Sequence, residues 1–156
     1  MRILLCMCLV HTQLQVNRSI DLSEIRHLFV NAPIREDDEN RLRKIMLNIN
    51  SDTDNPVLVC YKGASEMIRA KYVFNPFVKL ELFNKGKELL EKGIKRDTLN
   101  PEARFIRFSI QNNLPLMLGY HDEVNTDRQF LQEQTKNMND SELKAMIVHY
   151  LNMQKK

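Results

Sequence analysis

Three Asn-Pro pairs constrain the fold of this chain more than any other feature of its sequence. They stand at Asn55-Pro56, Asn75-Pro76 and Asn100-Pro101. An asparagine side chain accepts hydrogen bonds from the unpaired amides of a first helical turn, and proline fits that turn because its position needs no N–H donor. Each pair therefore predicts the start of a helix.

Apolar residues recur at steps of three and four between these starts, which is the spacing of amphipathic helices. The expected helices cover residues 19–31, 37–50, 56–73, 77–96, 101–113, 123–137 and 140–154. The pattern is weakest at 123–137, so we expect six or seven helices. Pro33 and Pro115 follow periodic segments and are expected to end them. Asn139, three residues before Glu142, is expected to open the last helix with a spacing close to the capping box.

The chain shows no sign of a β-sheet. No segment alternates apolar and polar residues for long enough to demand a strand, and 4 Gly and 5 Pro are too few for a many-turned β-sandwich or barrel. Short connections such as residues 73–75 are expected to join antiparallel neighbours. The expected fold is all-α, an antiparallel array of six to seven helices in a single domain over residues 17–156.

The first residues resemble a secretory signal in composition. Arg2 precedes a short apolar run from Ile3 to Val10, and no apolar periodicity continues after residue 11. Residues 1–16 therefore predict export to the periplasm or the medium; the alternative is a frayed start or a buried terminal strand of a cytoplasmic protein. The run is far below the roughly 20 residues that span a bilayer, so we do not expect a membrane-spanning protein.

Glycines mark one face of the fourth expected helix. Gly86, Leu90 and Gly93 give it a small, a large and a small residue. Each internal glycine costs about 1 kcal/mol against alanine, so two on one face indicate close packing against a partner helix. Phe77, Leu80 and Phe83 are expected on the apolar stripe of the same helix.

The segment from Leu82 to Phe108 resembles the junction between two tetratricopeptide (TPR) repeats. The glycine-spaced helix is followed by a short linker and by residues 100–103, Asn-Pro-Glu-Ala, like the start of the next unit. Glycine replaces the family's usual alanine, Thr98 replaces its proline, and the Asn-Pro marks lie further apart than its unit of about 34 residues. The resemblance implies a TPR-like, degenerate helical repeat.

The whole chain also resembles short exported bacterial proteins of unassigned function. The segments that carry this resemblance are Tyr-Lys-Gly-Ala at residues 61–64 and Asn-Pro-Phe at residues 75–77. The resemblance implies no activity.

Residues that commonly carry catalysis are present but scattered. The four histidines, His11, His27, His121 and His149, have no metal-ligand spacing. Glycine loops for phosphate, nucleophile elbows and paired catalytic carboxylates are missing from the sequence. Cys6, Cys8 and Cys60 form no disulfide framework, and Cys60 is expected as a small core residue. We therefore expect no enzyme, no cofactor and no metal.

One loop offers an alternative function. The segment from Leu114 to Asp122 is unusually apolar for a loop, and we expect it to pack against the helices. Tyr120 and His121 stand beside Asp122, and a loop can bring an acid and a base together. The alternative is a small-molecule-binding protein or an enzyme that uses the 114–123 loop. The simpler interpretation makes Asp122 the cap of the helix that follows.

Basic residues suggest a partner-binding face on the third and fourth expected helices. The candidates are Lys62, Arg69, Lys71, Lys79 and Lys87. A solvated surface is the simplest interpretation, and binding of an acidic peptide is the next. Nucleic acid is disfavoured, because the formal net charge is only +3 and exposed aromatics are not expected between the basic residues.

Tyr61 and Tyr72 are candidate aromatics of a ligand groove, with half-buried packing as the alternative. Together with the TPR-like junction, these residues predict a non-catalytic module that presents a groove to a protein or peptide. The identity of the partner and the oligomeric state are left open.

Overall fold

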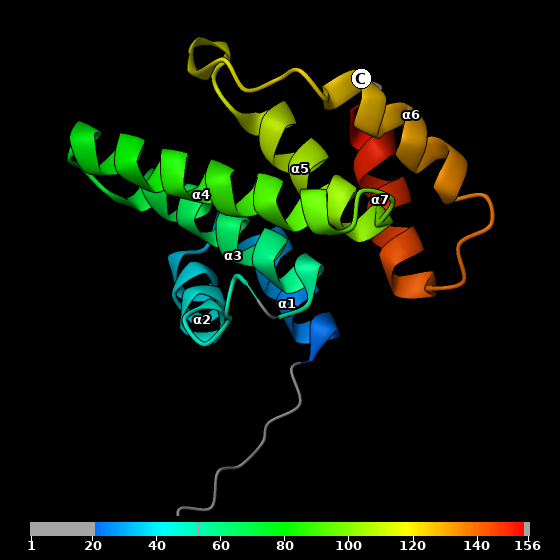
Figure 1. Cartoon of the computed structure of the whole chain (residues 1–156), viewed down its shortest axis with the longest axis horizontal. Helices are drawn as coiled ribbons and strands as arrows, with labels where there is room; N and C mark the ends of the chain where they lie inside the picture. Colours follow the sequence, from blue (N-terminus) through cyan, green and yellow to red (C-terminus); the bar gives the residue numbers. More distant parts are fainter. Residues whose placement is uncertain (1–20, 53, 155–156) are drawn as a thin grey trace, which may run out of the picture.

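The computed structural model describes residues 21–52 and 54–154, and within these ranges it contains helices and no strands. The all-α prediction is therefore confirmed (Figure 1). The α-helices are α1 (Leu22–Asn31), α2 (Glu36–Met46), α3 (Pro56–Arg69), α4 (Pro76–Arg96), α5 (Pro101–Asn113), α6 (Val124–Gln134) and α7 (Ser141–Met153), with short 3-10 helices η1 (Ala70–Tyr72) and η2 (Leu116–Leu118). The predicted signal segment, residues 1–16, lies outside the described residues.

The three Asn-Pro pairs begin helices as predicted. Asn55 accepts a hydrogen bond from the Val57 amide at 2.9 Å, and Asn75 accepts one from the Phe77 amide at 2.9 Å. Asn100 caps α5 in the same way. These caps fix where α3, α4 and α5 start, because each satisfies amides that have no partner inside the helix.

Two predicted caps are wrong. Helix α7 is capped by Asp140, which accepts from the Leu143 amide at 2.9 Å, so Asn139 lies one residue before the cap. Glu142 does not complete a capping box, because its carboxylate binds side chains of α1 instead. Helix α6 has Glu123 at its cap position and no side-chain cap, so Asp122 does not have the role expected of it.

The helices pack as consecutive neighbours, and the odd-numbered helices also form a continuous row. Helix α1 packs on α2, α3 on α4, and α5 on α6, while α3 contacts both α1 and α5, and α5 contacts α7. Figure 1 shows α3 and α4 side by side along the middle of the molecule, with α7 beside α5 and α6. The core therefore runs along the odd-numbered row, and the even-numbered helices cover it.

Helices α3 and α4 meet through three glycines, Gly63, Gly86 and Gly93, which we call the glycine seam. A Cβ atom added to Gly86 would lie 2.5 Å from the Gly63 carbonyl oxygen, and one added to Gly63 would lie 2.6 Å from the Gly86 oxygen. A Cβ on Gly93 would lie 2.7 Å from the Pro56 oxygen. The predicted close packing is confirmed, and Gly63 is the partner that the sequence pattern did not reveal.

The odd-numbered helices are joined by a buried arginine. Arg26 of α1 donates to both carboxylate oxygens of Glu102 in α5 at 2.8 Å. It also donates to Asp140 at 2.7 Å and to Glu142 at 2.8 Å, at the start of α7. Tyr61 of α3 donates to Glu102 at 2.7 Å. We call these five residues the Arg26 hub.

A second arginine joins α4, α5 and α6. Arg107 of α5 binds Asp127 of α6 through two hydrogen bonds of 2.7 and 2.9 Å, and its third contact is Glu91 of α4 at 3.2 Å. Arg104 also binds Asp127, at 2.6 Å. Tyr120, from the loop between α5 and α6, donates to Glu91. Tyr120 therefore anchors its end of this loop on α4.

Candidate interaction surface

The aromatic pair proposed for a groove does not line one. Tyr61 is fully buried, and its hydroxyl belongs to the Arg26 hub. Its ring packs edge-on against the Phe29 ring, with 5.4 Å between the two ring centres. Tyr72 is half-buried, and its hydroxyl donates to the Ala32 carbonyl at 2.6 Å. The groove interpretation is wrong for Tyr61, because the row of odd-numbered helices encloses it.

The five basic candidates do not form one face. Lys62 donates to the Ile49 carbonyl at 2.6 Å, toward the end of α2. Arg69 lies 3.8 Å from the Glu66 carboxylate on its own helix. Lys62 is therefore held on the side of α3 that faces α2, whereas Arg69 lies beside an acidic residue of its own helix.

Of the other three cations, Lys79 and Lys87 are on α4, and Lys71 is in η1 with its ammonium directed to the α1–α2 connection. Lys71 in η1 donates to the Pro33 carbonyl at 2.6 Å, and Lys87 lies over the Tyr120 ring, 4.8 Å from its centre. Lys79 is exposed near the start of α4. Within the described ranges, none of these three forms an ion pair with a carboxylate, whereas Lys85 binds Glu66 at 2.7 Å. Lys71 and Lys87 are thus engaged by a carbonyl oxygen and an aromatic ring, whereas Lys79 is exposed.

The 114–123 loop does not assemble an acid and a base. Tyr120 is buried against Phe83 and Glu91, and burial, followed by Glu91, raises the pKa of its hydroxyl. His121 contacts the Leu114 carbonyl at 3.2 Å, and Asp122 is exposed. The three side chains therefore lie in separate surroundings.

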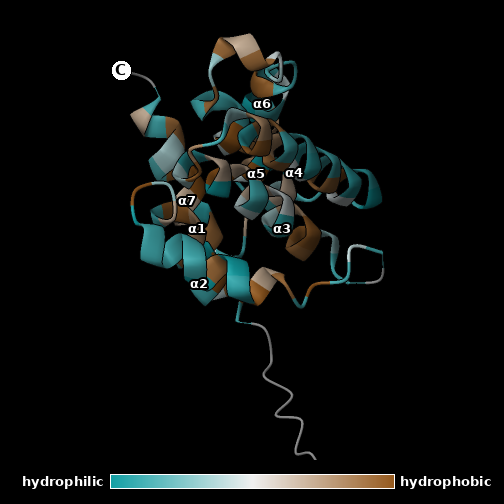
Figure 2. Cartoon of the chain, turned by 90° about the vertical axis from the view of Figure 1, so that its left-hand side faces the viewer, coloured by the Kyte–Doolittle hydropathy of each residue, from teal (hydrophilic) through white to brown (hydrophobic). Residues whose placement is uncertain are grey.

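The loop is also less buried than its composition predicts. Leu114 and Leu118 pack against the core as expected. Leu116 and Met117 are 83% and 91% exposed, so the apex of η2 is an apolar projection. Figure 2 shows this segment in hydrophobic colours at the top of the molecule.

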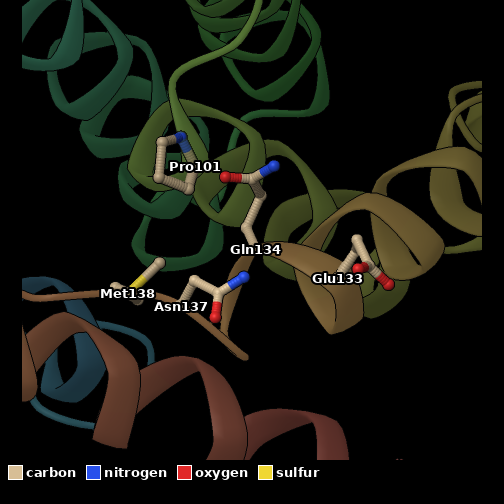
Figure 3. A pocket seen from close by; sticks show the side chains of 5 residues that line it. All are labelled: Pro101, Glu133, Gln134, Asn137 and Met138. Atoms are coloured by element: carbon tan, nitrogen blue, oxygen red, sulfur yellow. The ribbon is translucent and has the colours of Figure 1, made fainter.

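One hollow lies between the start of α5 and the end of α6. Its volume is about 320 Å³, and its lining residues are Pro101, Glu133, Gln134, Asn137 and Met138. Figure 3 shows Pro101 and Gln134 on one side, Asn137 and Met138 on the other, and Glu133 set apart from them. Glu133 is the one ionisable side chain of the set, and it pairs with Lys136 at 2.5 Å. The hollow brings no acid–base pair together.

The described residues contain one cysteine, Cys60, and no cluster of metal ligands. Cys60 is buried at the glycine seam, as expected of a core residue, and burial raises the pKa of its thiol to about 12. A thiol of that kind is unreactive at neutral pH. No group of three or more His, Cys, Asp or Glu side chains in the described ranges is arranged to hold a metal ion. Among the same residues, no helix has the length and apolarity needed to span a membrane.

Three large apolar side chains are exposed at the start of α4. Phe74 is 100% exposed, Phe77 is 81% exposed and Leu80 is 52% exposed. Phe77 and Leu80 are three residues apart on one helix and are therefore adjacent on its surface. Phe74 stands just before the cap of the same helix, and the exposed parts of the three side chains sum to roughly 400 Å². We call Phe74, Phe77 and Leu80 the end surface.

Two features leave these side chains uncovered: α4 is longer than α3, and Phe77 lies on the opposite face of α4 from Gly86, because nine residues are two and a half helical turns. Helix α4 has 21 residues and α3 has 14. Gly93 faces Pro56 at the start of α3, and Gly86 faces Met67 near its end, so the first turns of α4 extend past α3 (Figure 1). The prediction that Phe77 and Leu80 belong to the buried stripe is therefore wrong, whereas Phe83 is buried as expected.

A sequence signal for the exposure of Phe74 was available. An apolar residue just before a helix cap is usually covered by an apolar residue at the fourth helical position. Here the cap is Asn75, and the fourth position is Lys79. Phe74 therefore lacks the local partner that would cover it.

Comparisons with known proteins gave no match to any family model, curated protein or solved structure.

Proposed function

We propose that this protein is a non-catalytic interaction module that binds a protein or peptide through the end surface. The exposure of Phe74, Phe77 and Leu80 on a capped, firmly packed helix is the observation that carries the proposal. Large apolar side chains that gather exposed at one end of a helix commonly mark sites of protein interaction. Water must order around such side chains, so covering them by a partner is favourable.

The type of module is part of the proposal. Two observations support a TPR-like degenerate repeat. Consecutive helices form pairs, and the first helix of each pair contacts the first helix of the next. The segment between residues 82 and 108 also resembles a junction between two such repeats. Because a fold alone does not determine a function, the end surface rather than the helix arrangement is the basis for partner binding.

Site-specific photo-cross-linking tests the proposal. A photoreactive amino acid at position 77 should give a discrete cross-linked product in cells, because Phe77 would contact the partner. The same amino acid at position 99 is the matched control, since Leu99 is 73% exposed beyond the opposite end of α4. Equal patterns of products at the two positions would contradict a specific site.

Export is a separate proposal that rests on residues 1–16. Fractionating cells and determining the N-terminal residue of the protein would test it. A processed protein outside the cytoplasm is the expected result, and an unprocessed cytoplasmic protein would contradict it.

A further inference from the structure

We propose that Glu39 is a proton-sensitive contact that tightens the docking of α2 on α3 when the pH falls. The side chain of Glu39 is only 4% exposed, and its Oε1 atom has no hydrogen-bond donor. A carboxylate that is removed from water without donors is costly, and a bound proton removes most of that cost. The proposal concerns the interface between α2 and α3 and is independent of the end surface.

The nearest cation on α2 does not replace the missing donor. Arg43 places its Nε atom 3.8 Å from Glu39 Oε1, which is beyond hydrogen-bond distance. The Arg43 guanidinium donates instead to Asn40 at 3.2 Å. The adjacent buried carboxylate, Asp38, has a closer cation, because Arg35 Nε lies 3.2 Å from its Oδ2 atom. Glu39 is therefore the less compensated of these two buried carboxylates.

Helix α3 adds a second carboxylate whose hydrogen bonds are incomplete. The side chain of Glu66 is 13% exposed, and Lys85 of α4 binds its Oε1 atom at 2.7 Å. Its Oε2 atom has no hydrogen-bond donor, and the Arg69 guanidinium is 3.8 Å away. The negative charge of Glu66 acts on Glu39 across the interface. Neutral Glu39 would therefore relieve both the cost of burial and the repulsion between the two carboxylates.

Charged and titratable groups surround Glu39 on several elements. They are Glu36 and Arg43 of α2, Glu66 and Arg69 of α3, and Tyr72 of η1, with Lys85 of α4 beyond Glu66. Helix α1 also packs on α2, but its Arg26 belongs to the hub, and its Glu24 and His27 are exposed. Proton uptake by Glu39 is thus opposed by two arginines and favoured by burial and by two carboxylates.

The direction of the response follows from proton linkage. Burial is the main cause that raises the pKa of Glu39 above its ordinary value of 4.5; Arg43 and Arg69 reduce the rise, and Glu36 and Glu66 add to it. A raised folded-state pKa gives a contribution to stability that is fully present below 4.5 and is lost as the pH rises through the folded-state value. Acidification from neutral pH should therefore strengthen the docking of α2, which covers part of α1 and α3.

Hydrogen exchange of the α2 amides in the full chain tests the proposal. After correction for the intrinsic pH dependence of exchange, these amides should be protected about threefold or more strongly at pH ~5 than at pH ~7. Glu39→Gln protein carries a neutral side chain of nearly the same size and should be strongly protected at both pH values. Asp37→Asn protein is the matched control, because its carboxyl is exposed on the same turn, and the pH dependence should remain.

A carboxyl titration by NMR provides a second measurement, which needs no variant to fold. The carbon-13 signal of the Glu39 carboxyl in the wild-type protein should titrate with a midpoint above 4.5. A midpoint at or below that value would overturn the proposal. The same conclusion would follow if α2 were no better protected at the lower pH, or if Glu39→Gln protein kept the wild-type pH dependence.

Discussion

The glycine seam and the Arg26 hub join helices in opposite ways. At the seam, backbone meets backbone, and no space is left for a single methyl group. At the hub, a guanidinium meets three carboxylates, and the connection depends on charge. The seam joins two helices that are adjacent in the chain. The hub joins Arg26 to Glu102, Asp140 and Glu142, which lie 76, 114 and 116 positions further along the chain.

The difference indicates what each contact tolerates. A backbone contact is sensitive to volume and insensitive to pH, because it contains no titrating group. An ionic contact is sensitive to the loss of one partner, because the remaining charge stays buried. Variants at the two places should therefore respond differently to size, charge and acid.

The largest effect is expected at the seam. Gly86→Leu protein should fail to fold, because a leucine side chain meets the Gly63 carbonyl and must separate α3 from α4. Asn84→Ala, on the exposed side of the same helix, is the matched control and should leave stability nearly unchanged. Circular dichroism and thermal unfolding measure both. A Gly86→Leu protein that melts like wild type would contradict close packing at the seam.

Removing the hub arginine should have the next largest effect. Arg26→Met leaves Glu102 buried without its cation and should lower the free energy of unfolding by about 3–5 kcal/mol. Lys136→Met is the control, because the Lys136–Glu133 pair is exposed on both sides and its loss should cost less than about 1 kcal/mol. Urea unfolding measures both changes.

A double variant separates charge from packing at the hub. Arg26→Met/Glu102→Gln protein should be more stable than Arg26→Met protein, because the uncompensated carboxylate is gone. If the double variant were the less stable of the two, buried charge would not explain the loss.

Tyr61→Phe should have a smaller effect. Burial, and then Glu102, raises the pKa of Tyr61 well above its ordinary value, so its hydroxyl remains a hydrogen-bond donor. The variant keeps the ring against Phe29 and loses one hydrogen bond to a carboxylate, which should cost about 1.5–3 kcal/mol. Urea unfolding should show this change, and a cost below a few tenths of a kcal/mol would mean that α3 is not coupled to the hub.

Acid should have the smallest effect, and of the two contacts it should act on the hub rather than on the glycine seam. The Leu143 amide, with help from Arg26, holds the pKa of Asp140 below its usual value, and Ser23 and Arg26 lower the pKa of Glu142. Such carboxyls stabilise the fold above their unfolded-state pKa values and lose that contribution as the pH falls through the folded-state values. Stability should therefore decrease below the ordinary values of 3.8 and 4.5.

The acid response can be assigned by comparing variants. Arg26→Met protein should lose less stability than wild type over the same pH interval, because part of the lowering of both pKa values is already absent. Unfolding free energies measured between neutral pH and this acidic range would test it. Equal losses in the two proteins would mean that the hub does not cause the acid response.

The helices were predictable because their signals are local. Asn100 and Pro101 start α5 through contacts within one turn, and the interval of α5 was predicted to the residue. Gly86 and Gly93 indicated a close contact because glycine is unfavourable inside a helix unless something approaches it. These features depend on neighbours in the chain, and the sequence alone displays them.

The hub and the end surface were not predictable in the same way. Arg26 and Glu102 look like solvated helix residues, since no local pattern records a partner 76 positions away. Periodicity also assigned Leu80 to the core, although its exposure depends on where α3 ends relative to α4. Tyr61 was predicted to line a groove for a similar reason, because its position on a helix does not reveal which other helices cover it.

The hub also has a consequence for synthesis on the ribosome. Helix α1 emerges early, but its arginine acquires carboxylates only from Glu102, Asp140 and Glu142. A nascent chain that ends before residue 102 therefore carries Arg26 without any of these carboxylates, and only a chain that extends past residue 142 supplies all three. The ionic contacts of the first helix should therefore be completed late, after the start of α7 has emerged.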